Sequence, residues 1–183
     1  MAQHTFKELL KELNACKEAI DWAEDMTIEQ VVKECHRGDW LLWLAHKINI
    51  DKRKLILAKG HCANTVRHLM KDERSLKAVD AAVDYGNGLI DDKQLKTAAA
   101  DAAAYAADAA DAADAAAYAA DAAYAADAAD AADAADAADA ADAAAYAANA
   151  AAAKEENQRQ TANICKEHIG ELIINKVNEL LNK

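Results

Sequence analysis

The most constraining feature of the chain is a tract of 56 residues, 98–153, that contains 40 Ala, 11 Asp, 4 Tyr and 1 Asn. Alanine has the highest helix propensity and each Asp costs about 0.7 kcal/mol relative to it, so the tract is predicted to be helical. A single helix from residue 91 to residue 167 would be about 115 Å long, which is too long for a compact domain of this size. We therefore expect at least one turn inside the tract, with a helical hairpin as one such arrangement.

The aspartates of the tract do not form one acidic face. From Asp127 to Asp142 every third residue is Asp, and a three-residue step turns by about 300° around a helix, so these side chains encircle it. This arrangement excludes the flat face of an ice-binding helix. The functions that remain possible for the tract are a mimic of nucleic acid, a solvated scaffold and a surface that binds a basic protein. The candidate partner-binding residues are Asp127, Asp130, Asp133, Asp136, Asp139, Asp142, Tyr118 and Tyr124.

The formal net charge of −11 comes entirely from this tract. Residues 1–97 carry 16 basic and 16 acidic side chains, and residues 154–183 carry 5 of each. A nucleic-acid-binding protein normally presents a basic stripe. Direct binding to nucleic acid is therefore not expected, whereas a basic protein partner stays open.

The cysteines and the lack of long apolar runs predict the compartment. Four widely spaced cysteines, without a signal peptide at the start, indicate a cytoplasmic protein with reduced thiols. No apolar run approaches the roughly 18–20 residues of a membrane span except the tract, whose aspartates oppose insertion. We therefore expect a soluble protein with no membrane partner.

Helix breakers are scarce, because the chain has no Pro and only 5 Gly. Apolar spacing predicts an amphipathic helix over residues 6–23 with a break near Asn14. Thr27 and Gln30 form a capping-box pattern, which predicts a short helix that ends before Gly38.

Other capping residues predict the remaining helices. Asp39 is expected to cap a helix over residues 40–47, and Asp51 a helix from 52 to about 70. The next helix is expected from about Ser75 to Tyr85, with Gly86 as its C-terminal cap. Beyond it, Asp91 is expected to begin a helical stretch that continues through the tract as far as Gly170. A last helix is expected from Glu171 to Leu181.

No segment shows sustained alternation with a period of two, so no strand is expected. The predicted fold is all-α, a multi-helix bundle with a long alanine-rich helical segment. Residues 1–97, 98–153 and 154–183 are expected to belong to one domain.

Two Cys–His dyads, Cys35–His36 and His61–Cys62, are the strongest candidates for metal ligands. Adjacent helical residues point about 100° apart and metal ligands are usually two to four residues apart, so neither dyad is expected to place both members on one ion. The chain has no glycine-rich phosphate loop, GxSxG, HExxH or CxxC motif. No metal, cofactor or catalytic residue is predicted, and the protein is expected not to be an enzyme.

Five side chains are candidates for a small-ligand pocket: Trp40, Trp43, Arg53, His61 and Arg67. The two tryptophans lie three residues apart on one predicted helix, which is most simply explained by a core position, although an exposed Trp would be a binding hot spot. The basic patch DKRK at residues 51–54, together with Arg67 and His68, is explained by contact with an acidic partner or, more simply, by a solvated surface.

Residues 38–70, GDWLLWLAHKINIDKRKLILAKGHCANTVRHLM, carry a recognisable pattern, and ACKEAIDWAED from Ala15 fits it as well. The pattern consists of Gly38, Asp39, Trp40, Leu41, Trp43, Leu44, Ala45, Asp51, Arg53, Leu57, Ala58, Cys62 and Ala63. It resembles bacterial immunity proteins of polymorphic toxin systems, specifically the family that is similar to immunity type five. The resemblance covers nearly the whole chain. The resemblance implies an all-helical domain that neutralises a toxin. Members intersperse Arg through the alanine region, whereas residues 97–153 of this chain contain none.

The leading functional hypothesis is therefore a non-enzymatic binding protein, of the immunity or inhibitor type. It would neutralise a basic toxin or defence effector by stoichiometric occlusion. Two alternatives stay open: a self-associating helical scaffold, and a phage counter-defence protein that sequesters a small signalling ligand.

Overall fold

The computed structural model describes residues 5–70, 73–108 and 151–182. These ranges form eight α-helices and one 3-10 turn, and they contain no strand. The helices are α1 (Phe6–Glu12), α2 (Lys17–Trp22), α3 (Ile28–Glu34), α4 (Gly38–Lys47), α5 (Lys52–Asn64), α6 (Glu73–Gly86), α7 (Asp92–Asp108) and α10 (Ala151–Leu181), and the turn is η1 (Arg67–Leu69). The prediction of an all-α, multi-helix fold is confirmed.

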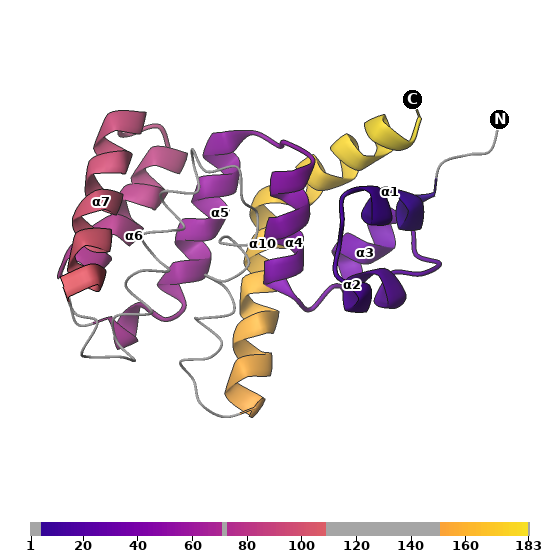
Figure 1. The fold of residues 1–183 in the computed structure, drawn as a ribbon, viewed down its shortest axis with the longest axis horizontal. Coiled ribbons are helices and arrows are strands. Elements are labelled where there is room, and N and C mark those ends of the chain that lie inside the picture. The colour runs from indigo at the N-terminus through magenta and orange to yellow at the C-terminus, as the bar shows by residue number, and fades with distance from the viewer. Residues whose placement is uncertain (1–4, 71–72, 109–150, 183) are drawn as a thin grey trace.

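The central helix of the molecule is α10, and the other helices are arranged around it (Figure 1). Both α4 and α5 pack directly on α10, and α3 packs near its C-terminal part. The next layer is α6, on α5, and α7 follows on α6. The short helices α1, α2 and α3 lie together at the opposite end from α7, close to both chain termini (Figure 1).

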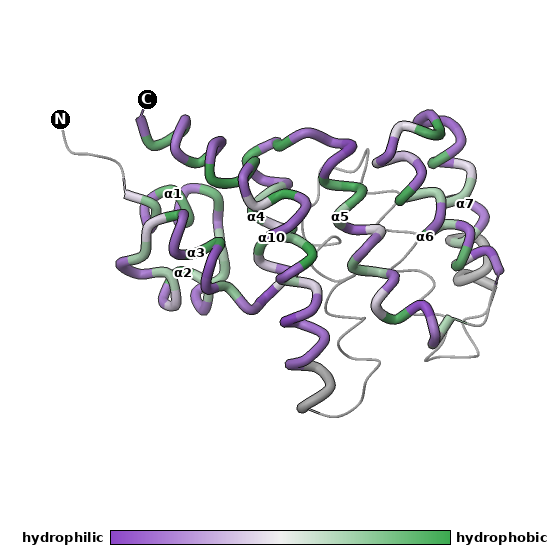
Figure 2. The backbone as a smooth tube through the Cα atoms, turned by 180° about the vertical axis from the view of Figure 1, so that it is seen from behind, coloured by the Kyte–Doolittle hydropathy of each residue, from purple (hydrophilic) through white to green (hydrophobic). Residues whose placement is uncertain are grey.

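The core is built around a buried stripe on α10. Its large members are Ile169, Ile173 and Val177, which recur every four residues and are at most 1% exposed. Full burial of an aliphatic side chain of this size contributes roughly 1.5–3 kcal/mol. Apolar and polar residues alternate at helical spacing along α10 and its neighbours (Figure 2), so each helix presents one side to the core.

Three predicted helix starts are confirmed by their capping hydrogen bonds. Thr27 and Gln30 exchange side-chain-to-backbone bonds in a capping box before α3. Asp91 and Gln94 do the same at the start of α7, with distances of 3.0 and 2.9 Å. The Asp51 carboxylate accepts a 2.9 Å bond from the backbone N–H three residues later and so caps α5.

Two predictions near the N-terminus have different outcomes. The break near Asn14 is confirmed: its φ of 61° lies in the left-handed region, and it separates α1 from α2. The prediction that Asp39 caps the next helix is wrong, because α4 begins one residue earlier, at Gly38, with Arg37 in the capping position. The Asp39 carboxylate instead accepts a 2.8 Å hydrogen bond from Nε of Arg37.

The predicted helix ends also need correction. The helix that begins at residue 52 stops at Asn64 and is followed by η1, not continued to residue 70. Gly86 is the last residue of α6, and the left-handed residue after it is Gly88, with a φ of 77°. Gly170 does not end a helix, since α10 runs straight through it. There a Cβ would lie 3.1 Å from a methyl group of Val32, so this glycine marks a close approach of α3 to α10.

The alanine tract is described only at its two ends. Residues 98–108 belong to α7 and residues 151–153 to α10, and both segments are helical as predicted. The expected turn and the helical hairpin lie outside the described residues. In the described ranges, no helix combines the length and the apolar character needed to cross a membrane.

Candidate functional site

A cavity of about 260 Å³ lies between α1, α2 and α4. The chain contains three tryptophans, and all of them, Trp22, Trp40 and Trp43, line this cavity. Phe6 and Leu10 of α1 contribute further apolar walls. The cavity therefore gathers most of the aromatic surface of the N-terminal half of the chain.

The aromatic rings of the cavity are packed against one another. The ring centroids of Trp22 and Trp40 are 5.8 Å apart, with the planes inclined at 56°. His36 meets Trp22 edge-on at 6.2 Å, and the Arg37 guanidinium lies 4.8 Å from the centroid of Trp40. Such aromatic and cation–π contacts favour one ring orientation, and all three tryptophans remain half-buried rather than sealed in the core.

A paired charge forms the polar edge of the cavity. Asp39 is only 3% exposed, and both of its carboxylate oxygens accept hydrogen bonds from Arg37, at 2.8 and 2.5 Å. Arg37 also lies 3.8 Å from the carboxylate of Glu18 on α2. A buried carboxylate is strongly destabilising without a partner, so Arg37 is required beside Asp39. The pair ties the start of α4 to α2 at the mouth of the cavity.

The position of α4 is set by its contact with α10. A Cβ built on Gly38 would lie 2.4 Å from Oγ1 of Thr161 and 2.7 Å from its backbone carbonyl carbon, so only glycine allows the two helices to approach this closely. Trp40 and Trp43 are three residues apart and therefore share the side of α4 that faces α1 and α2. The core of the molecule thus orients the tryptophans.

The chemistry of the cavity is that of an apolar binding site. Its walls are mostly aromatic and aliphatic, and its charged groups are already paired. Small-molecule pockets usually measure 300–1,000 Å³, so a space of about 260 Å³ is closer in size to one large side chain. Across the described part of the chain, no three His, Cys, Asp or Glu side chains are grouped so as to hold a metal ion.

The structure separates the five predicted pocket residues. Trp40 and Trp43 line the tryptophan cavity. Arg53 lies elsewhere, between α5 and α6, where its guanidinium is 4.3 Å from the ring centroid of Tyr85 and donates a 2.6 Å hydrogen bond to the Tyr85 carbonyl. That contact gives Arg53 a role in packing α5 on α6.

His61 and Arg67 occupy two further places. His61 stacks on His168 of α10, with ring centroids 4.5 Å apart and planes 8° from parallel. Burial, and then the neighbouring His168, lower the pKa of His61. Arg67 forms a two-pronged ion pair with Asp80 of α6, at 2.6 and 3.0 Å. The five residues therefore do not surround one common cavity.

The buried cysteines form contacts of their own. Cys62 and Cys165 place their sulfur atoms 3.8 Å apart between α5 and α10. The hydrogen bond to Cys62 and the burial of Cys165 raise the pKa of Cys165, and burial raises the pKa of Cys35 to about 11. Thiols of this kind are unreactive near neutral pH.

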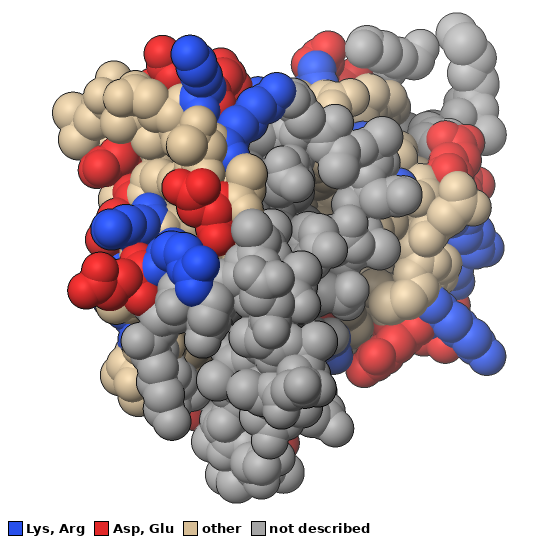
Figure 3. All heavy atoms as spheres, turned by 60° about the vertical axis from the view of Figure 1, so that its left-hand side comes forward, with Lys and Arg blue, Asp and Glu red and all other residues tan. Residues whose placement is uncertain are grey.

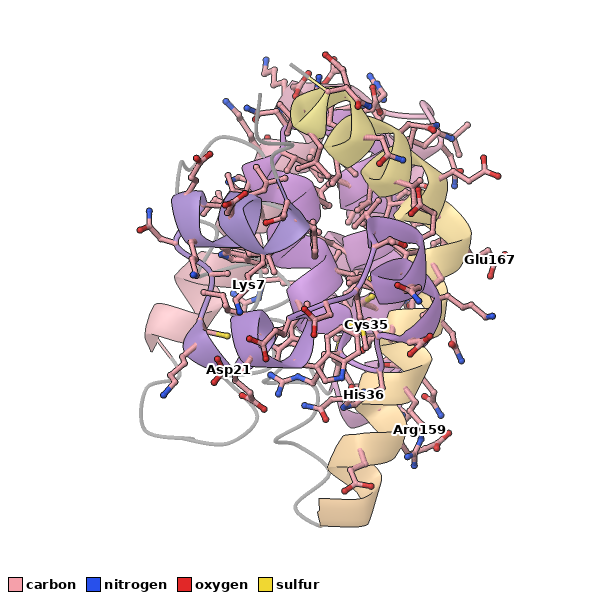
Figure 4. The ribbon with its side chains drawn as sticks, turned by 90° about the vertical axis from the view of Figure 1, so that its right-hand side faces the viewer. Lys7, Asp21, Cys35, His36, Arg159 and Glu167 are labelled. Carbon is pink, nitrogen blue, oxygen red and sulfur yellow. The ribbon has the colours of Figure 1, made fainter. Side chains whose placement is uncertain are left out.

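Neither Cys–His dyad acts as a unit in the structure. Figure 4 looks onto the end of the molecule formed by α1–α3, where Cys35 and His36 are labelled. Cys35 is buried at the end of α3, whereas the ring of His36 is turned to Trp22. In the second dyad, Cys62 contacts Cys165 and His61 stacks on α10.

Sequence reasoning missed Trp22, Phe6 and Arg37 as residues of the site. A usable signal was present for Trp22, because the three tryptophans of the chain all fall between residues 22 and 43. No local pattern relates Phe6 or Arg37 to them. The eight candidate partner-binding residues of the tract, Asp127, Asp130, Asp133, Asp136, Asp139, Asp142, Tyr118 and Tyr124, lie outside the described residues.

Comparison with known proteins does not add a relative to this picture. No family model, no curated protein and no solved structure matches the chain.

Proposed function

We propose that the protein is a non-enzymatic binding protein that neutralises a toxin or defence effector by stoichiometric occlusion. The observation that carries this proposal is the cavity of about 260 Å³ lined by all three tryptophans of the chain. In the proposed complex, one apolar side chain of the partner enters this cavity.

The size and surroundings of the cavity favour a side chain over a free ligand. Binding hot spots are typically Trp-rich pockets that receive one anchor residue and are ringed by polar groups. Here the ring is supplied by Arg37 and Glu18 at the edge of the tryptophan-lined space, and the buried Asp39 holds Arg37 in place. Because these charges are already paired, a partner needs only to exclude water from them.

The resemblance to immunity proteins supports the same proposal from a separate direction. Its most distinctive residues include Gly38, Trp40 and Trp43. Gly38 sets the distance between α4 and α10, and the two tryptophans line the cavity. Part of the pattern that suggests toxin neutralisation therefore lines the cavity, namely Asp39, Trp40, Leu41, Trp43 and Leu44.

The net charge of −11 supports a basic partner. Charge of one sign accelerates the encounter with a partner of the other sign and raises specificity more than it raises affinity. In this proposal the aspartates of the tract steer the partner, and the tryptophan cavity holds it.

The test fills the cavity without adding charge. Ala19 of α2 lines the cavity and is half-buried, so Ala19→Phe is expected to occupy the space and weaken partner binding by at least about tenfold. Ala100 is exposed on α7, at the opposite end of the molecule from the cavity, and Ala100→Phe is the matched control. The partner is first captured with the unsubstituted chain. Its affinity for each variant is then measured by calorimetry, and the inhibition of its activity is measured at increasing molar ratios of variant to partner.

Inhibition that is complete at equimolar amounts, and lost with Ala19→Phe but not with Ala100→Phe, is the expected result. Equal affinity of both variants would remove the cavity from the proposal. Inhibition at far less than equimolar amounts would be inconsistent with occlusion altogether.

A further inference from the structure

A second concave site lies at the other end of the molecule, in the groove between α6 and α7. Its volume is about 460 Å³, which falls within the range of small-molecule pockets. Arg74 and Lys77 of α6 line one side, and Lys93 of α7 lines the other. This groove shares no lining residue with the tryptophan cavity.

The groove is locally basic in an acidic chain. Among the described residues that line it, three side chains, Arg74, Lys77 and Lys93, are cationic and one, Asp101, is a carboxylate. The pair formed by Lys77 and Glu73 spans 4.0 Å, with side chains 72% and 87% exposed, and such an exposed pair is weak. Glu73 therefore holds the Lys77 ammonium group only weakly.

The two helices place these groups in register. Arg74 and Lys77 are three residues apart on α6, and Lys93, Thr97 and Asp101 follow at intervals of four on α7. Side chains at these spacings share one face of a helix. The basic groups of both helices thus face the same groove. Figure 3 turns the α7 side of the molecule toward the viewer, and on the atoms not drawn in grey the basic side chains lie among acidic ones.

The groove offers hydrogen-bond acceptors as well as cations. The Thr97 hydroxyl donates to the Lys93 carbonyl at 3.0 Å, so its oxygen is left to accept. Oε1 of Gln94 caps α7 by accepting from Asp91, which leaves the amide NH₂ as a donor for an anion. Asp101 accepts only. A bare phosphate ion would use the donors alone, whereas a molecule with hydroxyl or amino groups beside its phosphate would use both sets.

We propose that the groove between α6 and α7 binds a small phosphorylated molecule that carries hydroxyl or amino groups, with the phosphate on Lys77 and Lys93 and the rest of the molecule toward Thr97 and Asp101; ATP serves as the probe. A long polyanion such as nucleic acid is a poorer fit, because it would extend beyond the groove toward a chain whose net charge is negative. The site is independent of the proposed occlusion function.

The experiment is isothermal titration of the full chain with ATP, adenosine and inorganic phosphate in the absence of divalent cations. ATP is expected to bind with saturation, and adenosine and phosphate to bind at least about tenfold more weakly. Lys93→Gln and Lys77→Gln are each expected to weaken ATP binding by about tenfold, since each removes a charged hydrogen bond. Lys33→Gln on α3, also an exposed lysine, is the control and should leave ATP affinity unchanged.

Three results would overturn the assignment. These are no saturable heat with ATP at millimolar concentration, equal affinity for ATP and inorganic phosphate, and equal weakening by Lys93→Gln and Lys33→Gln. Circular dichroism of each variant confirms that it is folded. The Ala19→Phe variant should bind ATP normally, so failure of this site and failure of the occlusion function are told apart.

Discussion

At the scale of single residues, the side chain of Lys59 lies in surroundings that disfavour its charge. This lysine of α5 is 2% exposed, and its Nζ has no hydrogen-bond partner among the described residues. Burial lowers the pKa of Lys59 from 10.5 to about 8. The folded protein therefore binds fewer protons than the unfolded chain between about pH 8 and pH 10.5, and its stability should rise with pH across that window.

Replacement of this lysine by an apolar residue should stabilise the protein. Below about pH 8 the lowered pKa corresponds to a loss of about 3 kcal/mol, so Lys59→Met is expected to raise the free energy of unfolding at pH 7 by that order. Above pH 10.5 the amine is neutral in both states, and the gain should shrink. Urea denaturation across this pH range measures both effects.

Lys54→Met, at an exposed position of the same helix, is the matched control and should change neither the stability nor its pH dependence. A variant at position 59 whose stability follows the same pH curve as the unsubstituted protein would show that the buried amine is not the source of the dependence.

At the scale of the helices, glycine acts mainly by allowing close approach. A Cβ on Gly38 would collide with Thr161 of α10, and one on Gly86 would lie 2.4 Å from Cβ of Leu57 on α5. Both glycines are terminal residues of their helices, since Gly38 is the first residue of α4 and Gly86 the last residue of α6. Their presence there is explained by packing between helices, while Gly88 alone among the glycines has a positive φ.

Gly38→Ala should destabilise the protein although it improves helix propensity. The new Cβ would meet both the side chain and the backbone of Thr161, so α4 must move away from α10, at a cost of about 1–3 kcal/mol. Thermal denaturation measures the loss. Since α4 carries Trp40 and Trp43, the tryptophan emission of the folded variant should also shift.

Gly170→Ala is the comparison, because its Cβ would lie 3.1 Å from a methyl group of Val32 and 4.0 Å from Cβ of Lys166, with no backbone atom this close. A side chain can adjust where a backbone cannot, so this substitution should cost less than Gly38→Ala. Equal stability of Gly38→Ala and the unsubstituted protein would contradict the close contact of α4 with α10.

At the scale of the whole molecule, the described surface offers little for self-association. Among the residues whose exposure the structure describes, Leu89 is the one large hydrophobic residue that is exposed, at 72%. Stable homo-oligomers usually bury a contiguous apolar patch. The occlusion proposal predicts a monomer, whereas the self-associating scaffold that the alanine tract also suggested predicts an oligomer.

Light scattering coupled to size exclusion should give a mass of 19.6 kDa that does not change with protein concentration. The measurement is best made at physiological and at high salt, because the charge of −11 would keep copies apart at low ionic strength. A mass that rises with concentration at either salt would favour the scaffold.

The elements that were predictable from the sequence are those held by local interactions. The capping boxes of Thr27 with Gln30 and of Asp91 with Gln94 each connect groups three residues apart, and helix propensity acts over similar distances. The all-α class, most helix starts and the break at Asn14 were therefore predictable from the sequence.

The arrangement of the site was decided by tertiary contacts. Trp22 and Trp40 meet because Gly38, which has no side chain, allows α4 to pack closely on α10. Lys59 is buried because other helices cover α5. These contacts join groups far apart in the chain, so no local pattern encodes them. The sequence by itself determined the helices, their caps and the charge of −11, whereas the packing of α10 decided which side chains share a cavity.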